Sequence, residues 1–130
     1  MPKNIRPRVN RLARNKQDDK LSFVIKEVEE YVRARIKLHT KAARRKGDKL
    51  LAQIFLVQDK NALKYLNTGH LPKVVQFLAD EQELCRELAK SAREVMKELP
   101  RAQLLVQIRE AQIEAEMVGQ WIKVLSKQQR

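Results

Sequence analysis

The sequence predicts an all-α fold, an antiparallel bundle of about four helices with a basic N-terminal arm. Apolar residues recur at spacings of three and four along most of the chain, which is the period of a helix with one buried face. No stretch alternates apolar and polar residues for a useful length, and Asn-Gly and Asp-Gly hairpin dipeptides are absent from the sequence. Short breaks between long helical stretches favour antiparallel neighbours.

The length of 130 residues suits one domain of ordinary size, and we expect an arm over residues 1–16 followed by a single helical-bundle domain over residues 17–130. A composition of 43% apolar and 34% charged residues is typical of a globular protein. No apolar run approaches the roughly 20 residues that cross a bilayer. The N-terminus is basic but lacks the apolar stretch of a secretory signal.

The first 16 residues hold six basic side chains and no acid, together with Pro2 and Pro7. Their large apolar residues are too few to offset the entropy of ordering this segment in isolation. The sequence leaves open whether the arm is helical or extended when it is bound to a partner.

From Asp18 the pattern becomes helical, and Asp18 with Asp19 suits a helix start. We expect one long helix over residues 18–46, ended by Gly47. Its apolar face comprises Leu21, Val24, Ile25, Val28, Tyr31, Val32, Ile36, His39, Ala42 and Ala43.

Asp48 can cap a second helix over residues 49–67. Its segment from Leu50 to Val57 is apolar almost all round, with Gln53 as the exception. Such a helix is normally buried on more than one side. The segment therefore predicts either a central place in the bundle or a contact with another subunit.

Residues 67–70 form a helix stop, and Pro72 fits the first turn of a third helix. Both remaining helices repeat on heptads, which indicates packing at a shallow angle. Pro100 separates them; a tight antiparallel hairpin is favoured there over a kinked continuous helix. The third helix has Val74, Leu78, Cys85, Leu88, Ala92, Val95 and Leu99, with Glu81 at the skipped position, and the fourth has Leu104, Ile108, Ala111, Ala115, Val118, Ile122 and Leu125.

Residues for catalysis or metal binding are scarce. Two histidines and one cysteine cannot supply an ordinary structural zinc site, and no Gly-rich phosphate loop, nucleophile elbow or Glu-x-x-His pair occurs. His39 is expected to be a partly buried, hydrogen-bonded side chain, and Cys85 a core residue. We therefore expect no enzyme, no cofactor, no metal and no small-molecule substrate.

The net charge of +12 points to a polyanionic partner. The excess is concentrated in residues 1–16 and in residues 33–49, where eight basic residues stand against Asp48 alone. At about 100° per residue, the basic side chains of the long helix fall opposite its apolar face. The predicted nucleic-acid site comprises Lys3, Arg6, Arg8, Arg11, Arg14, Lys16, Lys26, Arg33, Lys37, Lys41, Arg44, Arg45 and Lys46.

Contacts from such residues are mainly to phosphates and carry little sequence information. Proteins that bind single strands usually offer aromatic platforms for base stacking. Here only Phe23 and Tyr31 lie near the basic helix, and Tyr31 belongs to its apolar face. The sequence therefore favours double-stranded DNA as the partner, with RNA as the alternative.

Arg6-Pro7-Arg8 with Arg11 and Arg14, the basic helix through Lys46 and the apolar hairpin that follows give a plan that covers the whole chain. In this plan the protein resembles the major capsid proteins of filamentous archaeal viruses. The resemblance implies a structural subunit of a virion, which pairs with itself or with a related subunit, wraps linear double-stranded DNA and stacks into a helical particle.

Other classes of function stay open. One is a cytoplasmic, nucleoid-associated role as a DNA-binding accessory or regulatory protein of a phage, plasmid or nucleoid, although the second helix is too apolar to be a recognition helix in a groove. Others are a bundle associated with RNA or the ribosome, and a module that binds proteins or an anionic membrane surface.

Overall fold

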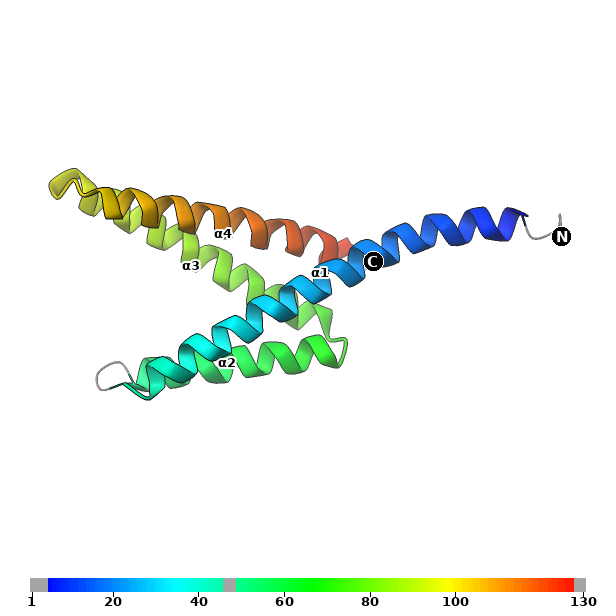
Figure 1. Cartoon of the computed structure of the whole chain (residues 1–130), viewed down its shortest axis with the longest axis horizontal. Helices are drawn as coiled ribbons and strands as arrows, with labels where there is room; N and C mark the ends of the chain where they lie inside the picture. Colours follow the sequence, from blue (N-terminus) through cyan, green and yellow to red (C-terminus); the bar gives the residue numbers. More distant parts are fainter. Residues whose placement is uncertain (1–4, 46–48, 128–130) are drawn as a thin grey trace. The chain divides into compact units, whose positions relative to one another are not determined.

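The computed structural model describes the backbone of residues 5–45 and 49–127, and side chains from Asp19 onward within these ranges. The described chain is all-α, with no strand (Figure 1). Its four helices are α1 (Ile5–Ala43), α2 (Lys49–Asn67), α3 (Leu71–Glu98) and α4 (Ala102–Lys127). Among these helices, none combines the length and the apolar character needed to cross a membrane.

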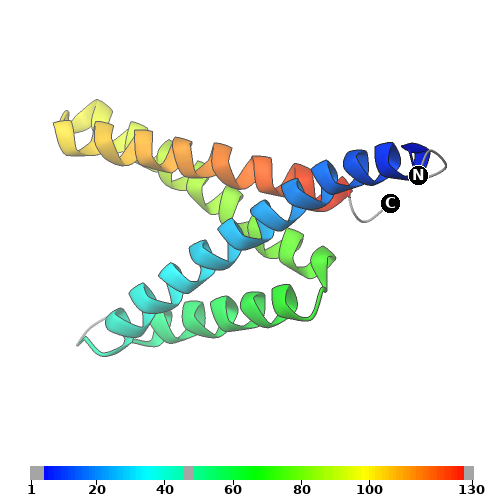
Figure 2. The same ribbon diagram turned by 45° about the vertical axis from the view of Figure 1, so that its right-hand side comes forward.

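The chain divides into two compact units, Met1–Asn67 and Thr68–Arg130. In the first hairpin (residues 1–67) α1 packs on α2, and in the second hairpin (residues 68–130) α3 packs on α4. Both views show the two helices of each hairpin side by side and antiparallel (Figures 1 and 2).

The long basic helix begins earlier than the sequence predicted. α1 starts at Ile5 and continues through Asp18 and Asp19, so the expected helix start at these two acids is wrong. Pro7 lies in the first turn of α1, where its missing N–H costs no helical hydrogen bond. The following residues are mostly good helix formers such as Arg, Leu, Ala, Lys and Gln. The predicted arm is therefore, from Ile5 onward, the N-terminal part of α1, which extends well past the end of α2 (Figure 1).

The apolar face of α1 is confirmed, because Val24, Val28 and Val32 are buried in the first hairpin. α1 ends at Ala43, three residues before the expected end. The backbone N–H groups of Arg44 and Arg45 donate to the carbonyls of Lys41 and Ala42 at 3.2 Å, which closes the last turn in the tighter i→i+3 pattern. The expected roles of Gly47 and Asp48 fall outside the described residues.

α2 has the predicted bounds, and its buried residues Ala52, Asp59, Ala62 and Leu66 repeat at spacings of seven, three and four. The predicted helix stop after Asn67 is confirmed. Gly69 adopts φ +75°, a left-handed conformation that glycine reaches without strain, and Pro72 lies in the first turn of α3.

The hairpin expected at Pro100 is confirmed: α3 ends at Glu98, Leu99 leaves helical geometry at φ −129° and ψ 82°, and α4 begins at Ala102. The predicted seam of α4 is also confirmed, with Ile108, Ala115, Val118 and Leu125 buried.

The predicted seam of α3 is only partly right. Val74, Leu78 and Cys85 are buried, but Leu88, Val95 and Leu99 are exposed, and the skipped position, Glu81, is buried instead. Farther along α3 the buried position is taken by Ala89. Leu88, Val95 and Leu99 lie on a second apolar stripe of α3, which runs beside the buried one.

Candidate nucleic-acid interface

The positive charge of the protein belongs almost entirely to the first hairpin. Residues 1–67 hold 18 of the 28 Lys and Arg and 7 of the 16 Asp and Glu, and so carry +11. Residues 68–130 hold the other 10 basic and 9 acidic residues and carry only +1. A polyanion is therefore attracted to the first hairpin far more strongly than to the second.

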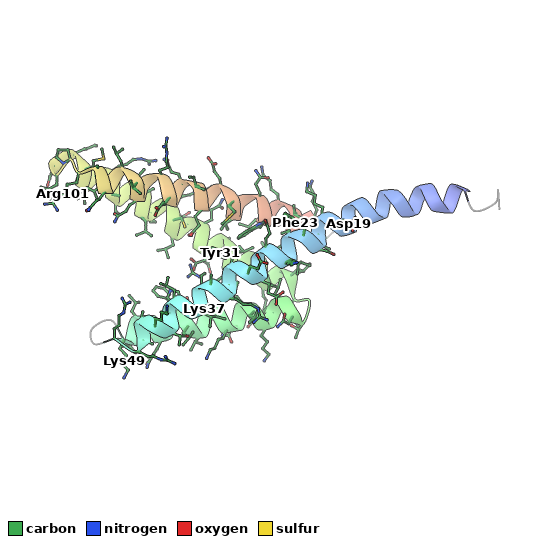
Figure 3. The ribbon with its side chains drawn as sticks, in the orientation of Figure 1. Asp19, Phe23, Tyr31, Lys37, Lys49 and Arg101 are labelled. Carbon is green, nitrogen blue, oxygen red and sulfur yellow. The ribbon has the colours of Figure 1, made fainter. Side chains whose placement is uncertain are left out.

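Within the first hairpin the basic residues that the structure describes form one exposed face of α1, which we call the basic face. Its members Lys26, Arg33, Lys37, Lys41 and Arg44 are all exposed. At about 100° per residue they lie opposite the buried valines that pack toward α2. From Lys26 to Arg44 the face spans about 27 Å at 1.5 Å per residue. Figure 3 labels Lys37 near the middle of this stretch.

One member of the basic face is already paired. Arg33 donates from Nε and Nη2 to Glu29 Oε1 at 3.1 and 2.9 Å, one helical turn away. This is an exposed pair of the kind that is worth only a few tenths of a kcal/mol, roughly 0.3–0.5 kcal/mol, so a phosphate can compete for the guanidinium. Arg45, which also belongs to the predicted nucleic-acid site, is exposed just beyond the end of α1.

For seven of the predicted site residues, the structure describes no side chain. Lys3 and Lys46 lie outside the described residues. For Arg6, Arg8, Arg11, Arg14 and Lys16, the side chains lie outside the described part of the chain. Their place in the interface stays a prediction.

Arg35, which contributes to the basic segment of the sequence, does not belong to the basic face. Its Nε donates to Asp59 Oδ1 at 3.1 Å, across the interface between α1 and α2. Its guanidinium also lies 5.7 Å from the centre of the Tyr31 ring, on the same helix. The charge of Arg35 is therefore used inside the hairpin.

Asp59 is the centre of a buried polar cluster. Its side chain is 1% exposed, and its second oxygen, Oδ2, lies 2.5 Å from His39 Nδ1. A carboxylate has no proton to give, so the imidazole donates in this pair. The His39 ring is also stacked on Phe55 of α2, with centroids 5.2 Å apart. The expectation of a partly buried, hydrogen-bonded His39 is confirmed.

This cluster positions the interface although it does not form part of it. Two side chains of α1, one turn apart, bind a single carboxylate of α2, which fixes both the rotation of α1 and its register against α2. With His39 and Arg35 turned toward α2, the residues on the far side of α1 must face outward. The role of Asp59 was not predicted from the sequence; the available signal was its place in the seven-three-four spacing of the buried residues of α2.

The aromatic side chains near the basic face do not form a stacking platform. Phe23 is 61% exposed on α1, two turns before Tyr31, and Tyr31 is half-buried (Figure 3). A run of bases would need successive exposed rings along the groove that holds the strand. The described part of α1 offers one.

The apolar segment of α2 is covered on one side only. Ala52 is buried and Phe55 and Leu56 are half-buried, whereas the outer side carries exposed residues. These are Leu50, Leu51, Ile54 and Val57, with exposed fractions of 47–72%. We call them the outer apolar face of α2. Within the first hairpin, α1 therefore leaves this side of α2 uncovered, and the central place and the subunit contact expected from the sequence both stay predictions.

The described residues include no group of three or more His, Cys, Asp or Glu that could hold a metal ion. Cys85 is buried, as expected, and its Sγ lies 2.7 Å from Glu114 Oε2 of α4, to which the thiol donates.

A groove of about 670 Å³ runs along one side of the second hairpin. Its floor is made of alanines and its edges carry Arg86, Arg93 and Lys123.

Comparisons with known proteins add nothing to this geometry. No family model, no curated protein and no solved structure matches the chain. The arrangement of its own residues is therefore what supports a function.

Proposed function

We propose that this protein is a structural nucleoprotein subunit that coats double-stranded DNA through phosphate contacts. The observation that carries the proposal is the exposed basic face of α1, which extends over about five helical turns and is interrupted by one acid, Glu30. In this proposal the role is structural rather than catalytic, the partners are duplex DNA and further copies of the chain or a related subunit, and the assembly is the capsid of a filamentous virus.

Charge and geometry support phosphate contacts rather than base readout. The basic face is a row of flexible Lys and Arg on one helix, and the outer apolar face of α2 has no side chain suited to reading base edges. Basic residues in a row bind the phosphate backbone and release counterions, and they discriminate little between sequences.

The duplex is favoured over single strands because the described part of the interface has a single exposed aromatic ring, Phe23. Coating is favoured over a regulatory role because α2, the helix that follows the basic helix, is too apolar on its outer side to serve as a recognition helix in a major groove. The outer apolar face of α2 also needs a cover, and neighbouring copies in a coat would supply one.

The salt dependence of binding tests the phosphate contacts. Lys37→Glu/Lys41→Glu should weaken binding to duplexes of unrelated sequence about equally and should lower the log–log salt slope by about 1.8 units, at roughly 0.9 per phosphate. Fluorescence anisotropy over 50–300 mM salt measures both. Lys49→Glu/Lys60→Glu, exposed lysines of α2, gives the same change in net charge and should lower the slope by less than half as much.

Equal losses for the two double variants would mean that net charge, and not the basic face, governs binding, and the proposal would be wrong. A loss that depends strongly on DNA sequence would favour the regulatory alternative. Deleting residues 1–16 removes six further cations and should lower the slope by up to about five units.

Negative-stain microscopy separates a coat from an accessory protein. With linear duplex DNA of several hundred base pairs, a coat should give continuous filaments of constant diameter. Discrete particles at intervals along the DNA would instead support a cytoplasmic accessory role, and tighter binding to single-stranded RNA than to the duplex would contradict the choice of partner.

A further inference from the structure

The second hairpin carries two stripes of opposite charge along α3. The basic stripe consists of Arg86, Lys90, Arg93 and Lys97, and the acidic stripe consists of Glu83, Glu87, Glu94 and Glu98. All eight residues are exposed. At about 100° per residue each stripe is confined to an arc of about 60°, and the two arcs are centred about 90° apart. The charges are therefore sorted by sign, although the hairpin is nearly neutral.

The charges of these stripes are not satisfied within the hairpin. None of the eight makes a hydrogen bond or ion pair with another described residue. By contrast, Glu29 and Arg33 on α1, at the same kind of spacing, are paired at 2.9 Å.

Like charges recur four residues apart along each stripe. Opposite charges four residues apart stabilise a helix, and like charges at that spacing destabilise it. Along the stripes, four of the five charged pairs at this spacing are alike in sign, namely Glu83 with Glu87, Arg86 with Lys90, Arg93 with Lys97, and Glu94 with Glu98. Opposite charges three residues apart, such as Glu83 with Arg86 and Glu87 with Lys90, are still close enough to pair within the helix. The sorting by sign nevertheless gives α3 two charged stripes, each of which can bind a partner of complementary charge.

The basic stripe also borders the groove of about 670 Å³ on the side of the second hairpin. Arg86 and Arg93 form one edge of this groove and Lys123 of α4 lies on the other, with Glu116 as its one acid. The small floor residues Ala89, Ala111 and Ala115 leave room for the side chains of another helix. The groove can therefore accept another helix, and its edges are mainly positive.

We propose that this surface binds the acidic stripe of α3 from a second copy of the chain. The acidic residues follow spacings of four, seven and four, and Arg86, Lys90 and Lys97 follow spacings of four and seven. Because the acidic spacing reads the same in both directions, three ion pairs can form together whether the two α3 helices run parallel or antiparallel.

The contact uses two different surfaces, so it does not close on itself. Each copy offers its basic stripe to one neighbour and its acidic stripe to another, which is a heterologous contact that generates an open row of copies. Exposed ion pairs are individually weak and do not overcome the cost of association in free solution. The contact is therefore effective where a duplex already aligns the copies, and in this respect it rests on the proposed function.

Cooperativity of DNA binding tests the contact. The affinity of each variant is measured on a duplex shortened until it binds one copy, and again on a long duplex, and the ratio of the two reports contacts between copies. For the unmodified protein we expect a preference of about tenfold for binding next to an occupied site, as a few exposed ion pairs would give. Two charge-reversal variants, Lys90→Glu/Lys97→Glu and Glu87→Lys/Glu94→Lys, should each lose it.

An equimolar mixture of these two variants should regain the preference, because every contact in an alternating row then joins opposite charges. In both helix directions, the residues reversed in one variant are those that face the residues reversed in the other. Arg109→Glu/Lys127→Glu changes the net charge as much as the first variant does, at exposed positions of α4, and should retain the preference. Far-UV circular dichroism of each variant checks that the helices are intact.

The outcomes separate this proposal from the proposed function. Variants that keep the preference, or a mixture that fails to regain it while circular dichroism is unchanged, would overturn the α3 contact and leave DNA coating untouched. Weaker binding of Lys90→Glu/Lys97→Glu to the single-copy duplex would show that the basic stripe binds DNA itself, which also overturns the contact. An unmodified protein that fails to bind the single-copy duplex would contradict the proposed function.

Discussion

Removing the carboxylate of Asp59 should destabilise the first hairpin, because it leaves two side chains of α1 without their shared acceptor. In Asp59→Ala, the guanidinium of Arg35 and the imidazole of His39 lose their shared acceptor while both stay in the interface between α1 and α2. Breaking a buried ion pair by removing one partner costs about 3–5 kcal/mol. Here the side chains of Arg35 and His39 are 16% and 13% exposed, so water can reach part of each.

We therefore expect a loss of about 2–3 kcal/mol, below the fully buried value. With a urea m-value of roughly 1–3 kcal/mol/M, the unfolding midpoint should fall by about 0.7–3 M. Far-UV circular dichroism measures this midpoint, and amide hydrogen exchange of α1 and α2 assigns the loss to the first hairpin. Asp59→Asn keeps one acceptor oxygen and should lose about half as much.

A loss below about 0.5 kcal/mol for Asp59→Ala would refute this reasoning, because exposed pairs are worth that little. A second variant tests the cause of the loss. Replacing all three partners together, as Arg35→Met/His39→Leu/Asp59→Leu, leaves no uncompensated buried charge and should cost less than Asp59→Ala alone. A triple variant less stable than Asp59→Ala would mean that the cluster stabilises the hairpin beyond the satisfaction of its own charges.

Two further predictions concern α2 and α4. Ile54→Asp should leave the free energy of unfolding within about 0.5 kcal/mol of that of the unmodified protein, because Ile54 is 47% exposed, but should prevent filaments on linear DNA. Phe55→Asp, which removes the ring stacked on His39, should cost about 2 kcal/mol or more. Filaments of Ile54→Asp with normal appearance would contradict a subunit contact at the outer apolar face of α2. Gly119→Ala should change stability by less than about 1 kcal/mol, because the gain in helix propensity is offset when the new Cβ, 2.7 Å from Gln82 Nε2, displaces the hydrogen bond of that amide to the Ala115 carbonyl. In the Gln82→Ala background the same substitution should stabilise by about 0.5–1 kcal/mol in urea unfolding, and a loss there would mean that the backbone at Gly119 cannot accept a side chain.

Much of this fold follows from local patterns in the sequence. The bounds of α2, the stop at Asn67 and the hairpin at Pro100 depend on nearby residues, and all were predicted. The start of α1 was not, because the two acids at positions 18 and 19 suit a helix start but are also tolerated inside a helix whose flanking residues favour it. The second half of the α3 seam was wrong because two apolar stripes compete there, and only the position of α4 decides which one is buried.

In the candidate site, too, features set by nearby residues could be predicted and features set by distant residues could not. The basic face of α1 could be placed from helical period alone, since it lies opposite a clear apolar face. The diversion of Arg35 into the hairpin could not, because it depends on Asp59, which is distant in sequence. A carboxylate in a seam position is a usable signal, but its partner is known only when the facing helix and its register are known.

The division into two hairpins has a consequence for how the protein is made. The first hairpin is formed by two helices that are adjacent in sequence, α1 and α2, which pack on each other. Helical proteins with such local contacts fold in microseconds to milliseconds. Ribosomes add about 5–20 residues per second, so the 63 residues after Asn67 take about 3–12 s to synthesise. We therefore expect the first hairpin, which carries +11, to fold and to meet any polyanion nearby before the nearly neutral second hairpin is complete.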